Sequence, residues 1–325
     1  MGGIGEGKTT LMDAFVNYIE GIEFEDEFRY KITNEKSDGD YSKSQTKEIT
    51  SYFLNYNRDD KNENEINIRI IDTPGIGVED IFQDETIIKK YKNLFKEIGE
   101  LDYILFTINS FSSRITSYNK FALDRIQRIF GKNLLERFML ICTFADGAKP
   151  SVLFGLENKH FIYQDYFEFN NSCLYNYNDD NNDNFNFNRV FWDLGKKNME
   201  KLFDFIIKKK LPPLSLNLSI QVIEKREKIL SIEQNLKDKK NQINILEIDK
   251  SIKKDIESIK YLQKELDSIA LKQGLLINEE VLEELMWHEF SEKRPRWSER
   301  YKKLEEIKKT NELIKTGNIY NYFKG

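Results

Sequence analysis

The motif that most constrains the fold lies in residues 2–9. Gly2, Gly7, Lys8 and Thr9 satisfy G-x-x-x-x-G-K-[ST], the pattern of a loop that binds nucleotide phosphates. Its glycines let backbone N–H groups face phosphate oxygens, Lys8 can reach the β- and γ-phosphates, and the Thr9 hydroxyl can bind Mg²⁺. A helical pattern follows directly, which argues against a flexible glycine-rich tail. The predicted nucleotide-binding residues here are Gly2, Gly5, Glu6, Gly7, Lys8, Thr9 and Thr10.

A strand should lead into such a loop, yet the motif begins with the first residues of the sequence. We therefore expect an α/β fold of the P-loop NTPase (G domain) class whose mostly parallel sheet lacks its first strand. The expected reason is a shortened chain with further residues upstream. Nucleotide binding should then be weak, and an apolar β-forming segment added ahead of Met1 should strengthen it.

A second motif, "IRIIDTPG", ends an apolar strand pattern with Asp72, Thr73, Pro74 and Gly75. An aspartate at this place can orient a Mg²⁺-bound water, and the Gly75 N–H can approach a γ-phosphate where a side chain would not fit. A lone D-x-x-G is usually a turn. Its place after a buried-type strand, downstream of a phosphate loop, makes it a second part of the nucleotide site.

Base recognition is expected at the ends of two further strands. In "TFAD", Thr143 to Asp146, the carboxylate can accept both N–H groups of the guanine edge. The usual guanine signature is [NT]-K-x-D, and here Phe144 replaces the lysine, so that its ring could pack along the base. A polar loop ends the last strand at Asn170, Asn171 and Ser172, where it can contact the base.

Strand and helix patterns alternate from Thr9 to about Lys210, which predicts a sheet covered on both faces and a G domain over residues 1–210. Residues 176–188 hold seven Asn in thirteen residues and are expected to form a flexible surface insertion. Two prolines at 212 and 213 mark the end of this domain.

Residues 214–273 form the predicted coiled coil. Ile229, Ile232 and Leu236 begin a seven-residue apolar repeat, which resumes in a shifted phase from Ile252. The shift indicates either a stutter or a turn between two helices. The seam could meet another copy, another protein or the chain's own globular part, and these alternatives stay open. Residues 274–325 are predicted to be a helical tail.

The motifs together resemble the AIG1-type (immunity-associated nucleotide-binding) GTPases, relatives of septins and chloroplast import GTPases, in a subgroup with a C-terminal coiled coil. The resemblance covers residues 2–210 and rests on "GEGKTTLMDAFVNYIEG", "SQTKEIT", "IIDTPGIG", "SSRIT", "ICTFADGAKP" and "FEFNNS". It implies GTP or GDP with Mg²⁺ as ligands. It also implies that Thr46 is the switch threonine on Mg²⁺, with Thr50 or Ser44 as alternatives, and that Arg114 is a candidate stabilising cation.

Composition excludes several other classes. The formal net charge of −5 argues against a dedicated nucleic-acid binder. No apolar run has the length that crosses a bilayer, and the two cysteines are expected to be buried thiols in a reducing compartment, so a cytoplasmic protein is expected.

A GTP-binding switch or assembly GTPase is the expected function. The residue after Gly75 is Ile76, where many hydrolysing relatives carry a glutamine that orients water, so slow intrinsic hydrolysis is expected. Self-association through the G domain and coiled coil would be the output. The alternatives are a G-domain scaffold with weak nucleotide binding and, less favoured, an ATP-driven mechanical enzyme.

Overall fold

A computed structural model describes residues 1–33, 48–57, 65–76, 84–111, 116–157, 161–175, 185–209, 211–240, 245–272, 278–293 and 296–316. The chain groups by its contacts into two units. The first comprises Met1–Glu79, Asp102–Asn119 and Glu136–Pro213, and the second comprises Asp80–Leu101, Lys120–Leu135 and Leu214–Gly325. Neither unit is continuous in sequence.

The first unit contains a three-stranded parallel sheet in the order β4 (Ile104–Asn109), β5 (Phe138–Thr143), β6 (Tyr166–Glu168). Every residue of β5 is buried. This is the dense apolar pattern that a parallel strand shows when both of its faces are covered. The carboxyl ends of β5 and β6 place residues 143–146 and 169–172 at one edge of the sheet.

The described part of this unit also contains a separate two-stranded sheet, which is antiparallel. β1 (Thr50–Asn57) and β2 (Glu65–Asp72) form an antiparallel pair in which Thr50 lies opposite Asp72. No regular strand precedes α1 (Lys8–Ile19) in the described part of the chain. Instead, Gly2 forms an isolated parallel bridge with Thr107 of β4, and Gly3 forms one with Ile76 beyond β2. The start of the phosphate loop therefore pairs with segments on both of its sides.

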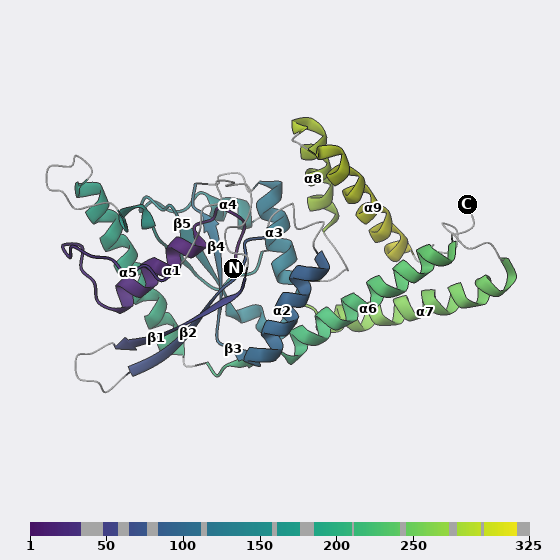
Figure 1. The fold of residues 1–325 in the computed structure, drawn as a ribbon, viewed down its shortest axis with the longest axis horizontal. Helices are drawn as coiled ribbons and strands as arrows, with labels where there is room; N and C mark the ends of the chain where they lie inside the picture. The colour runs from purple at the N-terminus through teal and green to yellow at the C-terminus, as the bar shows by residue number, and fades with distance from the viewer. Residues whose placement is uncertain are drawn as a thin grey trace. The chain divides into compact units, whose positions relative to one another are not determined.

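Helices α1 and α5 (Phe185–Lys209) lie beside each other (Figure 1). Their apolar side chains share one core with residues of β5 and β6. Tyr18 of α1 and Trp192 of α5 meet edge to face with ring centroids 5.1 Å apart. The main members of this core are Leu11, Phe15, Tyr18, Met139, Ile141, Phe167, Phe169, Trp192, Leu202 and Phe203. The core holds the helix that begins at the phosphate loop against the strands that end at the base site.

The Asn-rich segment predicted as a flexible insertion over 176–188 is helical at its end, because α5 begins at Phe185 and Asn188 is buried. Residues 176–184 lie outside the described residues. The remaining elements of this unit are α4 (Val152–Glu157) and the short 3₁₀ helix η3 (Asn171–Cys173), which follows β6.

The second unit joins elements from the middle of the sequence to the C-terminal helices. It includes α2 (Asp84–Ile98) and most of α3 (Ser117–Arg128), and η2 (Lys132–Arg137) begins in it. The two-residue strands β3 (Glu100–Leu101) and β7 (Leu214–Ser215) pair antiparallel. Phe95 packs against Phe130, and Lys92 of α2 binds Glu227 with its Nζ 2.6 Å from the carboxylate.

The predicted coiled coil is a helical hairpin rather than one unbroken rod. Helices α6 (Asn217–Lys240) and α7 (Ile245–Ile269) run side by side in opposite directions (Figure 1). The apolar repeat is buried between them, with Val222, Ile229 and Leu236 of α6 against Ile256, Ile259, Leu262 and Leu266 of α7. Of the alternatives left open by the sequence, the structure has two separate helices rather than one with a stutter, and the seam is covered within the chain.

The tail predicted to be helical contains α8 (Glu279–Glu292) and α9 (Trp297–Thr316), which pack on each other. Glu289 of α8 and Arg300 of α9 form a buried two-pronged ion pair with N–O distances of 2.9 and 2.8 Å. Among the described residues, no helix combines the length and the apolar character that crossing a membrane requires.

Candidate functional site

The phosphate loop passes directly into α1 at Gly7. This residue has φ 75°, a left-handed conformation that glycine adopts without strain, and Lys8 then begins the helix. The N-terminal N–H groups of α1 therefore open toward the loop, where backbone donors and the helix dipole favour an anion. Residues 2–10 have the backbone that a phosphate site requires.

Lys8 and Gly75 lie together at this loop, as predicted. The Lys8 side chain is buried, and its Nζ donates a hydrogen bond of 2.7 Å to the Gly3 carbonyl. A Cβ at Gly75 would lie 2.8 Å from Lys8 Nζ and 3.1 Å from the Ile4 Cα, so a side chain there would displace Lys8 and crowd the loop backbone. The motif at residues 72–75 therefore lies directly beside the phosphate loop.

The two predicted metal ligands of the described chain also meet. Thr9 Oγ1 lies 3.5 Å from Asp72 Oδ2, and Asp72 is buried at the end of β2. A hydroxyl and a carboxylate beside a phosphate loop are hard oxygen ligands, and Mg²⁺ is commonly held by one or two such protein ligands plus phosphates. This donor set fits Mg²⁺. Thr50, an alternative to Thr46 as switch threonine, lies opposite Asp72 in the strand pairing.

On the base side, Phe144 follows β5 in a left-handed backbone conformation with φ 56°. Its ring carbon Cε2 would lie 3.7 Å from a Cβ placed on Gly7. The aromatic ring thus flanks the phosphate loop, which is where a base could stack on it. Positive φ is costly for a bulky residue, and such strain concentrates at binding sites. Asp146 is exposed, and its Oδ1 accepts a 2.9 Å hydrogen bond from the Ala148 N–H.

The three residues predicted after β6 have different surroundings. The amide of Asn170 donates to the Ala145 carbonyl at 2.9 Å, and its Oδ1 accepts from both the N–H and the hydroxyl of Ser172. Asn170 and Ser172 therefore build the loop and join it to the segment that holds Asp146. Asn171 differs, since its Oδ1 is buried with no hydrogen-bond partner within the part of the chain that the structure describes.

Glu6 was predicted to contact the nucleotide, and the structure corrects its role. Its carboxylate accepts a 2.5 Å hydrogen bond from the Asn109 N–H at the end of β4, and the Asn119 side chain also binds it. Burial raises the pKa of Glu6, and the hydrogen bond from Asn109 opposes that rise. The Glu6 side chain supports the loop, and only its backbone remains available to phosphate.

A single hydroxyl connects the base motif to the phosphate loop. Thr143 Oγ1 lies 3.0 Å from the Glu6 carbonyl and 3.2 Å from the Ile108 carbonyl, and it can donate to either. Thr143 is thus a structural residue of the site, a role that its place in "TFAD" does not disclose.

Three predicted residues, Thr46, Ser44 and Arg114, lie outside the described residues. Ile76 is buried, and its N–H donates to the Gly2 carbonyl at 3.1 Å.

The sequence-based prediction missed Asp13, Asn109 and Asn119. Asp13 is a buried carboxylate on a helix whose neighbouring positions are apolar, and that contrast was a readable signal. For Asn109 and Asn119, nothing in the sequence indicates that they contact a residue about a hundred positions away.

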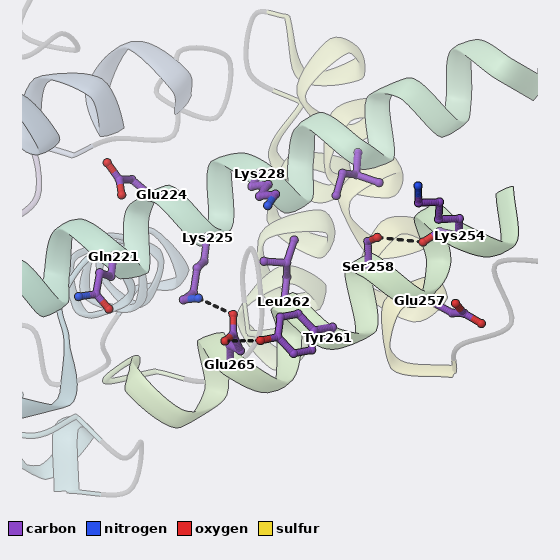
Figure 2. A pocket seen from close by; sticks show the side chains of 11 residues that line it. Gln221, Glu224, Lys225, Lys228, Lys254, Glu257, Ser258, Tyr261, Leu262 and Glu265 are labelled. Carbon is purple, nitrogen blue, oxygen red and sulfur yellow. Dashed lines mark hydrogen bonds and ion pairs between the residues drawn. The ribbon is translucent and has the colours of Figure 1, made fainter. Parts of the chain in front are cut away.

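A cavity of about 610 Å³ lies between α6 and α7, and none of its lining residues belongs to the motifs above (Figure 2). Two of its charged side chains form an ion pair within the lining. Lys225 Nζ lies 2.6 Å from Glu265, and the Tyr261 hydroxyl donates to the same carboxylate at 2.8 Å.

The fold and the site define an α/β nucleotide-binding domain of the P-loop class. Comparison with known families matches residues 40–181 to the AIG1 family, so the resemblance seen in the motifs is confirmed over that range. This part of the chain is therefore similar to AIG1-type G domains, a family of GTP-binding domains. The matched range contains Asp72, Gly75, Asp146 and the loop after β6. The search of curated proteins finds no match.

Proposed function

We propose that this protein is a GTP-binding switch that hydrolyses GTP slowly and controls assembly of its own copies or binding of a partner. One observation carries the proposal: three separate pairs, Lys8 with Gly75, Thr9 with Asp72, and Gly7 with Phe144, meet around one loop. The first two pairs join the phosphate loop to the motif at the end of β2, and the third joins it to the motif at the end of β5. These are the groups that a nucleoside triphosphate would span.

The chain's own groups have distinct roles in this proposal. N–H groups of the loop and of the first turn of α1 bind the β- and γ-phosphates, and Lys8 turns from the Gly3 carbonyl to the phosphate oxygens. Thr9 and Asp72 would hold Mg²⁺, which supplies positive charge to the phosphates. Gly75 offers its N–H to the γ-phosphate, so that the state of the nucleotide is sensed at the end of β2.

Guanine preference is proposed from the base side of the site. The exposed Asp146 carboxylate can accept the N1–H and the amino group of guanine, whereas adenine lacks this pair of donors. The Phe144 ring can cover one face of the base. Asn171 can place an amide at the base edge.

Slow hydrolysis is proposed because the position after Gly75 offers no group that orients water. Ile76 is buried and apolar, and its backbone is engaged with Gly2. Arg114 remains a candidate for the stabilising cation. A second copy or another protein could supply the missing groups, which would link hydrolysis to assembly.

The first prediction tests base choice. Asp146→Asn should weaken GTP binding at least tenfold and strengthen binding of xanthosine triphosphate, because the amide exchanges an acceptor for a donor toward the base edge. Titration of fluorescent GTP, ATP and xanthosine nucleotides against the full chain measures this. Asp193→Asn, an exposed change on α5, is the matched control. Unchanged GTP affinity in Asp146→Asn would exclude the proposed base site.

A scaffold that binds nucleotide weakly is the second candidate. The observation favouring it is that Lys8 already satisfies its charge partly through the Gly3 carbonyl, within the loop itself. The same titration with fluorescent nucleotides distinguishes the scaffold from the switch. Affinity in the micromolar range or tighter with guanine preference supports the switch, and the absence of both supports the scaffold.

A further inference from the structure

The hairpin of α8 and α9 carries a cluster of aromatic side chains at the end where α8 finishes and α9 begins (Figure 1). Phe290 of α8 contacts Trp297 and Tyr301 of α9, with the ring centroids 6.2 Å apart in both pairs. Trp297 and Tyr301 also contact each other, with their centroids 6.4 Å apart. Trp287 lies three residues before Phe290 and therefore on the same side of α8. We call these four side chains the aromatic cluster.

Half of the aromatic cluster is open to solvent. Trp287 is 65% exposed and Phe290 is 57% exposed, although both side chains are large and apolar. The hairpin does not need them for its own core, because Leu282 and Leu285 of α8 and Leu304 of α9 are fully buried. A group of neighbouring exposed aromatic side chains is typical of a surface that binds a partner.

A buried ion pair fixes the two helices directly beneath the aromatic cluster. Glu289 comes immediately before Phe290, and Arg300 comes immediately before Tyr301. The Arg300 guanidinium donates to both carboxylate oxygens of Glu289, at 2.9 and 2.8 Å. The rings of the two helices are therefore arranged before any partner binds.

The charge around the aromatic cluster is opposite in sign to that of the whole chain. Over the described residues from 287 to 303, five lysine and arginine side chains stand against three glutamates, a net charge of +2, whereas the full sequence carries −5. Lys293 Nζ lies 5.8 Å from the centre of the Phe290 ring and 5.9 Å from that of Trp297. Lys302 is exposed, one position after Tyr301. Cations therefore border the exposed rings.

Aromatic rings bordered by cations suit an anionic membrane surface. Trp and Tyr side chains are favoured at the level of the lipid headgroups, and lysines are attracted there by anionic lipids. Single-stranded nucleic acid is another polyanion that aromatic side chains bind, but its bases need open ring faces on which to stack. The rings of Phe290, Trp297 and Tyr301 meet at angles of 52° to 80°. They form one compact apolar surface rather than separate stacking faces, which favours the membrane.

We propose that the aromatic cluster docks this protein on membranes that contain anionic lipids. Trp287 and Phe290 enter the headgroup region, and Lys293 and Lys302 lie at the lipid phosphates. Such docking is peripheral and needs no membrane-spanning helix. The cluster lies outside the nucleotide-binding residues, so this inference goes beyond the proposed function and does not depend on it.

The experiment measures binding of the full chain to sucrose-loaded vesicles by sedimentation. Vesicles of phosphatidylcholine with about 30% phosphatidylserine are compared with vesicles of phosphatidylcholine alone, and we expect roughly fivefold tighter binding to the anionic vesicles. Tryptophan emission should also shift to shorter wavelength on the anionic vesicles. Trp192 is fully buried, so this shift reports on Trp287 and Trp297.

Substitutions then test the aromatic cluster itself. Trp287→Ala and Phe290→Ala should each weaken binding about tenfold, because each removes apolar surface that leaves water on docking. Lys293→Gln should weaken binding to the anionic vesicles about fivefold and leave binding to the neutral vesicles unchanged. The matched controls are Phe187→Ala, at a position of α5 that is 64% exposed, and Lys264→Gln, on the exposed side of α7. Both controls should bind vesicles as wild type does, and all these surface variants should keep the wild-type melting temperature.

Three results would overturn the inference. The first is the absence of binding between the wild-type chain and anionic vesicles. The second is unchanged binding in both Trp287→Ala and Phe290→Ala, since another part of the chain would then hold the membrane. The third is tighter binding of a fluorescent single-stranded oligothymidylate than of vesicles, lost in the same two variants, which would assign the cluster to nucleic acid.

Discussion

Glu6 places an ionisable group directly behind the phosphate loop. Its carboxylate is buried and accepts from Asn109 and Asn119, and burial raises its pKa above the ordinary value of 4.5. The folded protein therefore binds a proton at Glu6 more readily than the unfolded chain does. Its favourable contribution to stability is fully present below pH 4.5 and is lost as pH rises through the raised pKa.

The second prediction follows from the direction of this pH dependence of stability. Glu6→Gln keeps an acceptor oxygen for Asn109 but does not ionise, so its stability relative to wild type should increase as pH rises from about 4.5. Urea unfolding of both proteins across pH 4 to 8 measures the difference. Glu20→Gln, at the exposed end of α1, is the control and should track wild type. A difference between Glu6→Gln and wild type that is independent of pH would contradict the assigned pKa direction.

The residues that chemistry dictates could be read from the sequence. Phosphate needs a cation and a backbone without a side chain, which predicts Lys8 and Gly75. Mg²⁺ needs hydroxyl and carboxylate oxygens, which predicts Thr9 and Asp72. The structure brings these four residues together. Glu6 could not be placed correctly. Its partner Asn109 lies 103 positions away, and the motif alone does not show which loop side chains face inward.

At the level of elements, the Glu289–Arg300 pair holds α8 to α9. Both side chains are almost fully buried, with exposed fractions of 2% and 6%. Removing one partner leaves a buried charge without compensation, whereas replacing both with apolar residues removes the problem. The pair is therefore expected to define how the two helices align more than to add net stability.

The third prediction follows from this difference between removing one partner of the ion pair and replacing both. Arg300→Ala should destabilise the α8–α9 hairpin by about 3–5 kcal/mol, and Glu289→Leu with Arg300→Leu should be far milder. Hydrogen exchange of the two helices, read by mass spectrometry, measures the effect. Glu283→Ala breaks the exposed pair with Lys308 on the same helices and should change exchange little. Equal effects of Arg300→Ala and Glu283→Ala would argue against the role of burial.

Helices were more predictable than strands. The helical patterns ahead of Gly21 and Gly99 correspond to α1 and α2, because glycine with positive φ ends each of them. β1 is absent from the predicted strands, although Tyr52, Leu54 and Tyr56 alternate toward the core while Phe53 points outward at 74% exposure.

At the scale of the whole molecule, burial of the apolar seam between α6 and α7 limits how copies of the chain can assemble. Because α6 and α7 bury the seam within one chain, copies cannot associate through it unless the hairpin opens. Nucleotide-dependent assembly is therefore expected to use surfaces other than this seam.

The fourth prediction separates folding of the hairpin from assembly. Leu266 is fully buried, so Leu266→Ala should cost about 2–5 kcal/mol of hairpin stability. The molar mass from light scattering should stay equal to that of wild type, both in GDP and in a non-hydrolysable GTP analogue. Lys264→Ala, on the exposed side of α7, is the control. A mass halved by Leu266→Ala would show that the seam joins two copies.

The grouping of the chain into two units could not be predicted from its sequence. The double proline at 212 and 213 indicates a boundary, and the first unit does end there. Local patterns do not reveal that α2 groups with α6, because the ion pair between Lys92 and Glu227 spans 135 positions. Amphipathic periodicity shows that a helix has a face to bury and does not show against what.

The Thr143 hydroxyl has a consequence for how the nucleotide would be read. This hydroxyl lies within hydrogen-bond distance of the Glu6 carbonyl in the phosphate loop and of the Ile108 carbonyl in β4. Thr143 is also the first residue of the base motif. The Thr143 hydroxyl would then support both recognition of the base and binding of the phosphates. Discrimination between guanine and other bases should consequently be greater for triphosphates than for nucleosides, because a misplaced base would strain the loop that holds the phosphates.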